Sequence, residues 1–227
     1  MKRIISWILW VCLCFTWSES LAADYYTSAT AIEQVRMLLQ ETTNNFFTDT
    51  EIGNWIKEAT EDVSARSLCI QTSDTIALVT AQYEYTAFVT GGAASIVDAV
   101  KVWGCFYVSP DNEYIGLKRI EANQIADLPY MVAGPPKYYY HIADIIGILP
   151  LPTASENTQT VRVYYSEQSQ TIGDLPNEYQ PLTFWYAASQ AYEKQGQNDK
   201  ASSLYKKYLE ALNALKQELY NIVPEAK

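Results

Sequence analysis

The sequence is poor in the side chains that most enzymes use for catalysis. Its 227 residues include a single histidine, His141, and four cysteines. Acyl transfer normally needs a nucleophile beside a base, and zinc sites need several His or Cys ligands at short spacings. His141 follows three tyrosines in a predicted strand, and neither Cys69 nor Cys105 stands at a ligand spacing from it. We therefore expect no catalytic residues, no metal-binding residues and no enzymatic activity; His141 is interpreted as a polar side chain on the solvent side of a strand or at a subunit contact.

Glycine is scarce as well, with nine residues in the chain. The glycine pair Gly91-Gly92 is followed by Ala93 and Ala94, without the Lys-Ser or Lys-Thr of a phosphate-binding loop. No Gly-x-Gly-x-x-Gly turn is present either. We expect no cofactor-binding residues and no cofactor.

Positive charge is the third deficit. Sixteen Lys and Arg face 26 Asp and Glu, which gives a formal net charge of -10 and a pI near 4.6. This is the wrong sign for a protein that holds nucleic acid through its phosphates. An acidic surface suits a soluble protein, or one that lines a passage through which DNA moves without sticking.

One long apolar run stands near the start of the chain. Residues 1-23 combine Met1-Lys2-Arg3, an apolar stretch from Ile4 to Trp17, and Ser20-Leu21-Ala22. This pattern is typical of a secretory signal cleaved after Ala22, although an apolar docking helix within an assembly is the alternative. Fourteen residues would span about 21 Å as a helix, so we expect no stable membrane span. Without this segment Cys69 and Cys105 remain, either as a pair or as two free thiols.

We expect residues 24-227 to form a single globular domain of the α+β class, because helix patterns stand on both sides of strand patterns. The pattern Thr30-Ala31-Ile32-Glu33 predicts a capped helix start, and Thr48-Asp49-Thr50-Glu51 repeats it. Helices are therefore expected within residues 29-66 as an N-terminal αα-hairpin. A second αα-hairpin is expected within residues 176-222, after Asp174 to Tyr179, with Gly196 closing one helix and Asn198 capping the next.

Between the hairpins, residues 72-172 predict a small, mostly antiparallel β-region. The hydrophobic period changes toward two, and turn residues separate the runs. A short helix is expected from Ile115 to Leu128, because its apolar residues share one helical face and Pro129 follows. Strands are expected at Thr75 to Thr80, Tyr83 to Val89, Ala99 to Val108, Lys137 to His141, Ile145 to Leu149 and Thr160 to Tyr165.

Tyrosine is the residue in excess, with 18 in the chain. Its large apolar ring and polar tip suit extensive contacts, in a core or at an interface, more than a carbohydrate platform. The apolar stripe of the last helix is wider than one hairpin needs. We expect Tyr205, Tyr208 and Tyr220 to remain available for neighbouring subunits or a portal, and Tyr208→Asp to weaken assembly while the subunit stays folded.

Several segments resemble one known family. These are, along the chain, Phe47 to Ile52, the run Ile145 to Pro152, the strand Val161 to Tyr165, the Asp174 to Tyr179 link and the helical pair around Gly196. In this order they are similar to the head-to-tail adaptor (connector) proteins of tailed phages. The resemblance implies a structural virion protein of the phage neck. It implies a ring, commonly of twelve subunits, docked beneath the portal protein and joined to tail or nozzle proteins, with DNA only in passage. It also implies helices packed between neighbours and a β-region facing tail components or the DNA path.

The C-terminal helices leave a second interpretation open. Tyr192, Gly196, Ala201 and Tyr205 also match the spacing of one tetratricopeptide unit. An exported periplasmic scaffold or binding protein would explain the N-terminal segment better and the β-region worse, and one such unit cannot bury a solenoid core. A secreted hydrolase is the third alternative, with almost no residue to support it.

Overall fold

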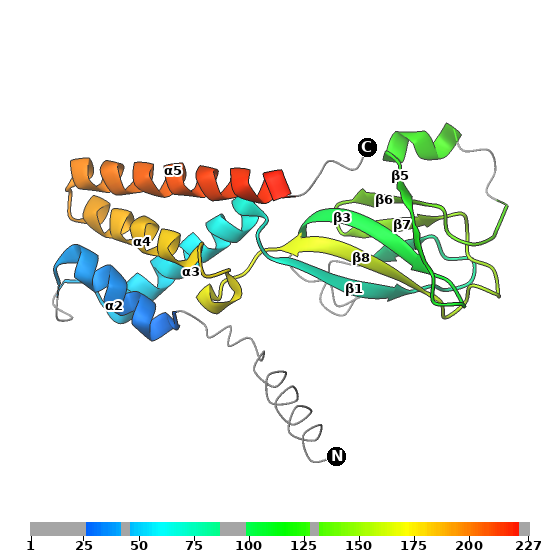
Figure 1. Ribbon diagram of the computed structural model, residues 1–227, viewed down its shortest axis with the longest axis horizontal. Coiled ribbons are helices and arrows are strands. Elements are labelled where there is room, and N and C mark those ends of the chain that lie inside the picture. Colours follow the sequence, from blue (N-terminus) through cyan, green and yellow to red (C-terminus); the bar gives the residue numbers. More distant parts are fainter. Residues whose placement is uncertain (1–25, 42–45, 87–98, 128–131, 223–227) are drawn as a thin grey trace, which may run out of the picture.

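The protein divides into a helical lobe and a β-lobe (Figure 1). The computed structural model describes residues 26–41, 46–86, 99–127 and 132–222. The helical lobe holds α2 (Ser28–Leu39), α3 (Asp49–Ser67), α4 (Gln180–Lys194) and α5 (Asn198–Ile222). The β-lobe holds the eight strands described below, between α3 and α4 in the sequence. The mixed α+β class predicted from the sequence is thereby confirmed, while the signal-like residues 1-23 lie outside the described part.

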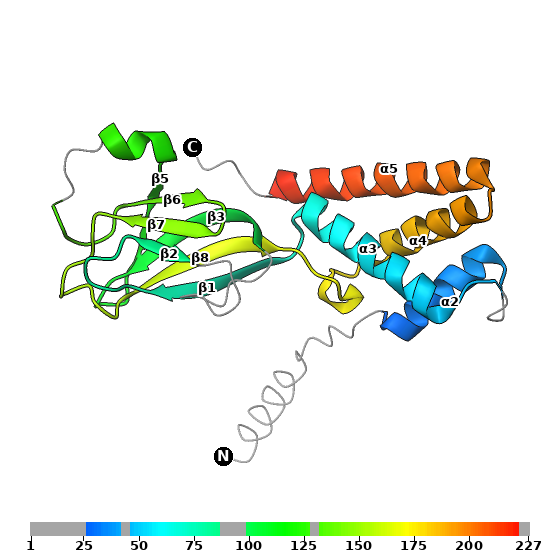
Figure 2. The ribbon, with the colours of Figure 1, turned by 180° about the vertical axis from the view of Figure 1, so that it is seen from behind.

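The helical lobe is formed by helices from both ends of the described chain. Helix α4 packs against α2, α3 and α5 and is the central helix of the lobe. One apolar cluster joins Val35 of α2, Ile52 of α3 and Phe184 of α4. A second joins Val63 of α3 to Leu212 of α5. Chain segments more than a hundred residues apart therefore share one helical core (Figure 2).

Capping threonines set the starts of α2 and α3. The Thr48 hydroxyl accepts the Glu51 amide, so the predicted start of α3 is confirmed. For α2 the prediction is wrong by about one turn, because Thr27 is the N-cap and Thr30 is its partner in a reciprocal capping box. The Ala31 amide already bonds to the Thr27 carbonyl, which closes the first turn before the predicted start. Gly196 (φ 73°) follows α4, as predicted.

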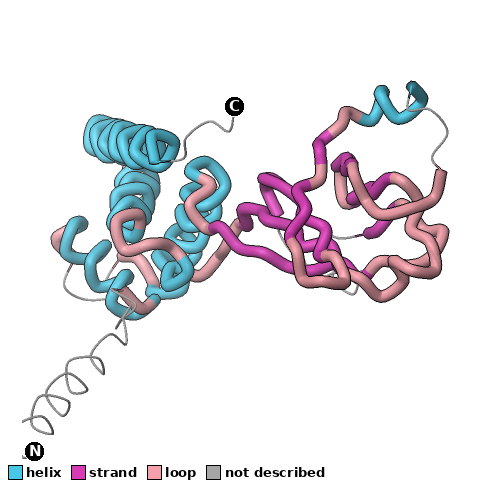
Figure 3. Tube along the Cα trace, turned by 45° about the vertical axis from the view of Figure 1, so that its right-hand side comes forward, coloured by secondary structure: helices cyan, strands magenta, loops and turns pink. Residues whose placement is uncertain are grey.

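Two four-stranded sheets form the β-lobe. Sheet A is antiparallel in the order β1 (Gln71–Ala77), β8 (Thr160–Glu167), β3 (Ala99–Val108), β4 (Tyr114–Gly116). Sheet B has the order β2 (Glu84–Thr86), β7 (Ile145–Leu149), β6 (Tyr138–Ile142), β5 (Lys118–Arg119), of which β5 and β6 are parallel. One face of sheet A packs on one face of sheet B around a shared apolar core. Figure 3 shows the strands on one side and the four α-helices on the other, with the short helix Ala122–Asp127 beside the strands.

The strand predictions have mixed outcomes. Ala99–Val108 and Ile145–Leu149 agree with the structure at both ends. The predicted strand from 83 to 89 lies partly outside the described residues, and its described part, residues 83–86, contains β2. The helix predicted from Ile115 to Leu128 is wrong: β4 and β5 occupy its first residues, and only a 3₁₀ helix, η1 (Ala122–Asp127), follows. Backbone partners on β3 and β6 hold residues 114–116 and 118–119 in strands, which local spacing cannot reveal.

Candidate assembly interface

Tyr208 is part of the helical core and not of the subunit surface. Its side chain is 0% exposed, and its ring makes an edge contact with Tyr186 at 5.5 Å between centroids. Its hydroxyl donates to Asp62 of α3, which also pairs with Arg66 at 2.7 Å. Burial, followed by the bond to Asp62, raises the pKa of Tyr208. The expectation that Tyr208 is available to a neighbour is corrected by this burial, and Tyr208→Asp would disrupt the subunit itself.

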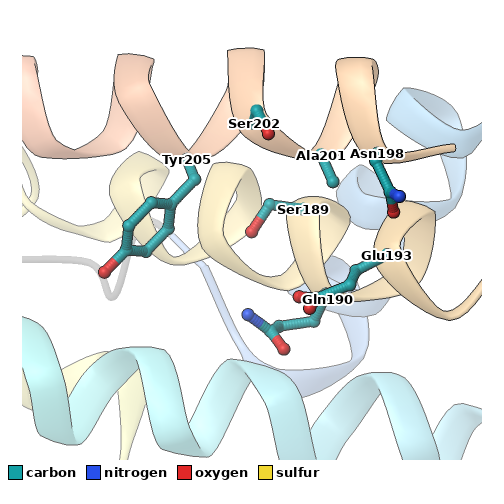
Figure 4. A pocket seen from close by; sticks show the side chains of 7 residues that line it. All are labelled: Ser189, Gln190, Glu193, Asn198, Ala201, Ser202 and Tyr205. Carbon is teal, nitrogen blue, oxygen red and sulfur yellow. The ribbon is translucent and has the colours of Figure 1, made fainter.

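Tyr205 lies one turn earlier on α5 and is half-buried. It stands at one end of a hollow of about 380 Å³ between α4 and α5. In Figure 4 the lining side chains come from both helices, and the Tyr205 hydroxyl points away from the helix contact. The hollow is lined by Ser189, Gln190, Glu193, Asn198, Ala201, Ser202 and Tyr205.

The small residues of this hollow explain its shape. Ser189 and Ala201 are buried where α4 and α5 meet, and neither side chain is long enough to fill the surface above the contact. Glu193 and Asn198 add a carboxylate and an amide beside Tyr205. The arrangement can receive a protruding side chain through hydrogen bonds and one aromatic contact. Of the three predicted interface tyrosines, Tyr205 is the one placed here; the side chain of Tyr220 lies outside the described residues.

A second surface, on sheet A, was not predicted from the sequence. A hollow of about 860 Å³ is lined by Trp103, Phe106, Tyr114 and Tyr164 together with polar residues of β1. The register shift between Val102 and Gly104 interrupts the alternation of side chains along β3, so the signal in the sequence was limited to the aromatic residues Trp103 and Phe106. It could not be read as a surface without knowing which strands lie beside β3.

His141, Cys69 and Cys105, which the sequence offered as candidate catalytic or metal-binding residues, lie in different parts of the fold. His141 is on β6, and burial lowers its pKa. Cys69 and Cys105 are free thiols, and burial raises the pKa of both. Within the described ranges, no three His, Cys, Asp or Glu residues are grouped as metal ligands. Nor is any helix in those ranges long and apolar enough to cross a membrane.

Comparison with known proteins finds similar solved structures and a matching family profile. Two solved structures share 15% sequence identity with the chain at a TM-score of 0.28: "Neck of empty GTA particle computed with C6 symmetry" and "Virion of native gene transfer agent (GTA) particle". The first alignment covers 71% of this chain and 77% of that chain, and the second covers 73% and 77%. No curated protein matches significantly. The profile of the SU10 adaptor protein family, in contrast, matches residues 26–224, which include both lobes. The chain belongs to the SU10 adaptor protein family.

Proposed function

We propose that this protein is a structural subunit of a phage neck, located in the virion. In this role it forms an oligomeric ring that joins the portal to the tail and lets DNA pass. The observation that carries the proposal is the adaptor-family match over residues 26–224. The match runs through the helical lobe and the β-lobe alike, so it concerns the whole described architecture.

The ring requires two different patches on each subunit. Head-to-tail contacts close into a ring when each subunit turns by a fixed angle, and a portal template can supply that angle. The hollow with Tyr205 between α4 and α5 is one such patch, because a half-buried tyrosine beside small and polar residues suits an interface anchor. The two αα-hairpins expected from the sequence would place these helices between neighbours. A dodecamer is the expected size.

The partners follow from the position in the neck. The subunit would bind the portal protein on one side and tail or nozzle proteins on the other. A net charge of -10 suits contact with DNA only in passage. The proposed role uses no cofactor and no catalysis.

The exported-scaffold alternative gains no support from the family match. A single tetratricopeptide-like hairpin would account for α4 and α5 and leave the β-lobe unexplained. The adaptor match includes residues 71–167 and thus accounts for both.

The proposal is tested by mixing the full chain with the portal protein of the same phage and imaging the product by electron microscopy. We expect rings on the portal. Tyr205→Asp should reduce ring yield, whereas Tyr83→Asp, at a tyrosine 43% exposed in the β-lobe, should not. A wild-type chain that stays monomeric with its portal present would contradict the proposed function.

A further inference from the structure

The outer face of sheet A is defined by the strand register. Ile76, Val163 and Cys105 point into the core shared with sheet B, so their neighbours along each strand point outward. This outer face consists of Gln71, Ser73, Thr75 and Ala77 on β1; Thr160, Arg162, Tyr164 and Ser166 on β8; Lys101, Trp103, Phe106 and Val108 on β3; and Tyr114 on β4.

Large aromatic side chains on this face remain exposed. Tyr114 is 53% exposed and Tyr164 is 38% exposed. With Trp103 and Phe106 they line one continuous hollow. Aromatic residues gathered in this way, as opposed to scattered singly, are typical of an interaction surface.

The side chains of the outer face are already held in place. The Trp103 indole N–H donates to the Ser166 hydroxyl at 2.7 Å, and Ser166 donates to the Leu68 carbonyl at 3.2 Å. Lys101 Nζ lies 4.0 Å from the Trp103 ring centroid. The rings of Phe106 and Tyr164 meet edge to face at 5.5 Å. A surface ordered before binding loses less conformational entropy when a partner arrives.

The charge of the outer face is opposite to that of the chain. Its charged residues are Lys101 and Arg162, and Arg162 lies 5.5 Å from the Tyr114 ring. None of the outward positions of these four strands carries Asp or Glu. The whole chain, in contrast, carries a net charge of -10. A second copy of the chain is therefore an acidic partner for this cationic, aromatic face.

We propose that the outer face of sheet A is a docking surface for a neighbouring copy of this chain. The inference rests on the proposed ring and assigns one of its two patches. The contact joins unlike surfaces, as a closed ring requires, because a cation-only face repels its own equivalent on a second copy. DNA is the weaker candidate, since two cations offer few phosphate contacts against the net negative charge.

Photo-crosslinking identifies the occupant. A benzoylphenylalanine in place of Tyr164 is introduced into the full chain, with the same replacement of Tyr83 as the matched control. Isotopically labelled and unlabelled copies are mixed and assembled on the portal, with tail proteins and DNA present. We expect crosslinked peptides that join labelled to unlabelled copies from position 164, and several-fold fewer from position 83. Crosslinks from position 164 to the portal, to a tail protein, to DNA or within one copy would overturn the inference.

Charge reversal provides the second measurement. Arg162→Glu and Lys101→Glu should each lower the yield of rings about tenfold. Lys137→Glu, at an exposed lysine outside the outer face, should leave the yield unchanged. Circular dichroism checks that each variant is folded. Normal rings from both reversed variants would overturn this inference and leave the proposed function standing, whereas a wild-type chain that forms no ring on its portal would contradict both.

Discussion

The helical lobe and the outer face of sheet A use tyrosine in opposite ways. In the helical lobe Tyr179, Tyr192 and Tyr208 are buried, and each hydroxyl finds an acceptor on another helix or carboxylate. On the outer face Tyr114 and Tyr164 stay exposed. A tyrosine whose polar tip is satisfied inside the subunit serves folding, and one that is held in place but uncovered is available to a partner. An excess of tyrosine therefore indicates neither use by itself.

We expect the largest effect on stability from replacing a buried tyrosine of the helical lobe. Tyr208→Asp would place a carboxylate beside Asp62 in the core between α3 and α5. We expect the free energy of unfolding to fall by more than about 3 kcal/mol, because an aromatic ring is lost and a charge is buried. Urea unfolding followed by far-UV circular dichroism measures the change. Tyr205→Asp, at a half-buried site, should cost about 1 kcal/mol, and equal losses for the two variants would contradict the burial of Tyr208.

Substitutions at two glycines, one in each lobe, test how tightly the two lobes are packed. A Cβ at Gly147 of β7 would lie 1.9 Å from the Tyr140 ring, whereas a Cβ at Gly53 of α3 would meet Ile32 at 3.9 Å. Gly147→Ala should destabilise the protein by about 1–3 kcal/mol through this overlap. Gly53→Ala should stabilise it by about 0.5–1 kcal/mol, because alanine loses less backbone entropy in a helix. Thermal unfolding of both variants against wild type gives the two signs, and destabilisation by Gly53→Ala would show that α3 is packed more tightly than described.

The reactivities of the two free thiols distinguish the core of the β-lobe, which holds Cys105, from the segment between α3 and β1, which holds Cys69. Burial raises the pKa of Cys105 to about 12 from 9.0, while Cys69 is less deeply buried. At pH 8 we expect iodoacetamide to modify Cys105 about tenfold more slowly than Cys69, as measured by peptide mass spectrometry. Between pH 9 and about 12 the unfolded thiol at position 105 ionises before the folded one, so stability should fall as pH rises. Equal alkylation rates would contradict the closed core of the β-lobe.

The sequence predicted local features better than the pairing of distant ones. The start of α3 depends on Thr48 and its next three residues, and the β3 run is rich in β-branched and aromatic residues, so both could be read locally. The burial of Tyr208 depends on Asp62, which is 146 residues away. The strands at 114–116 and 118–119 likewise depend on β3 and β6, and their apolar spacing also fits a helix. The expectation that Tyr205 is available to a neighbour came from the residue spacing of α5 alone. The hollow beside Tyr205 also depends on α4, and the outer face of sheet A required the order of its strands.

We expect the smallest effects on stability from removing the N-caps of α2 and α3, and the two losses should differ. Thr48→Ala removes the bond to the Glu51 amide, and Thr27→Ala removes the capping box of α2. Thr48→Ala should cost about 1 kcal/mol in global stability. Thr27→Ala should cost less, because α2 buries only Ala31 and Val35 and its first turn can fray without opening the core.

Hydrogen exchange distinguishes local from global opening at these caps. For Thr27→Ala we expect faster exchange in the first turn of α2 and unchanged protection in the β-lobe. For Thr48→Ala the effect should extend along α3, because Phe47 beside the cap is fully buried and Arg36 reaches across to Asp49 at 2.6 Å. These contacts couple the start of α3 to the core that α4 shares with α2. Equal exchange patterns for the two variants would mean that α2 is as tightly coupled as α3, and that the helical lobe opens as one unit.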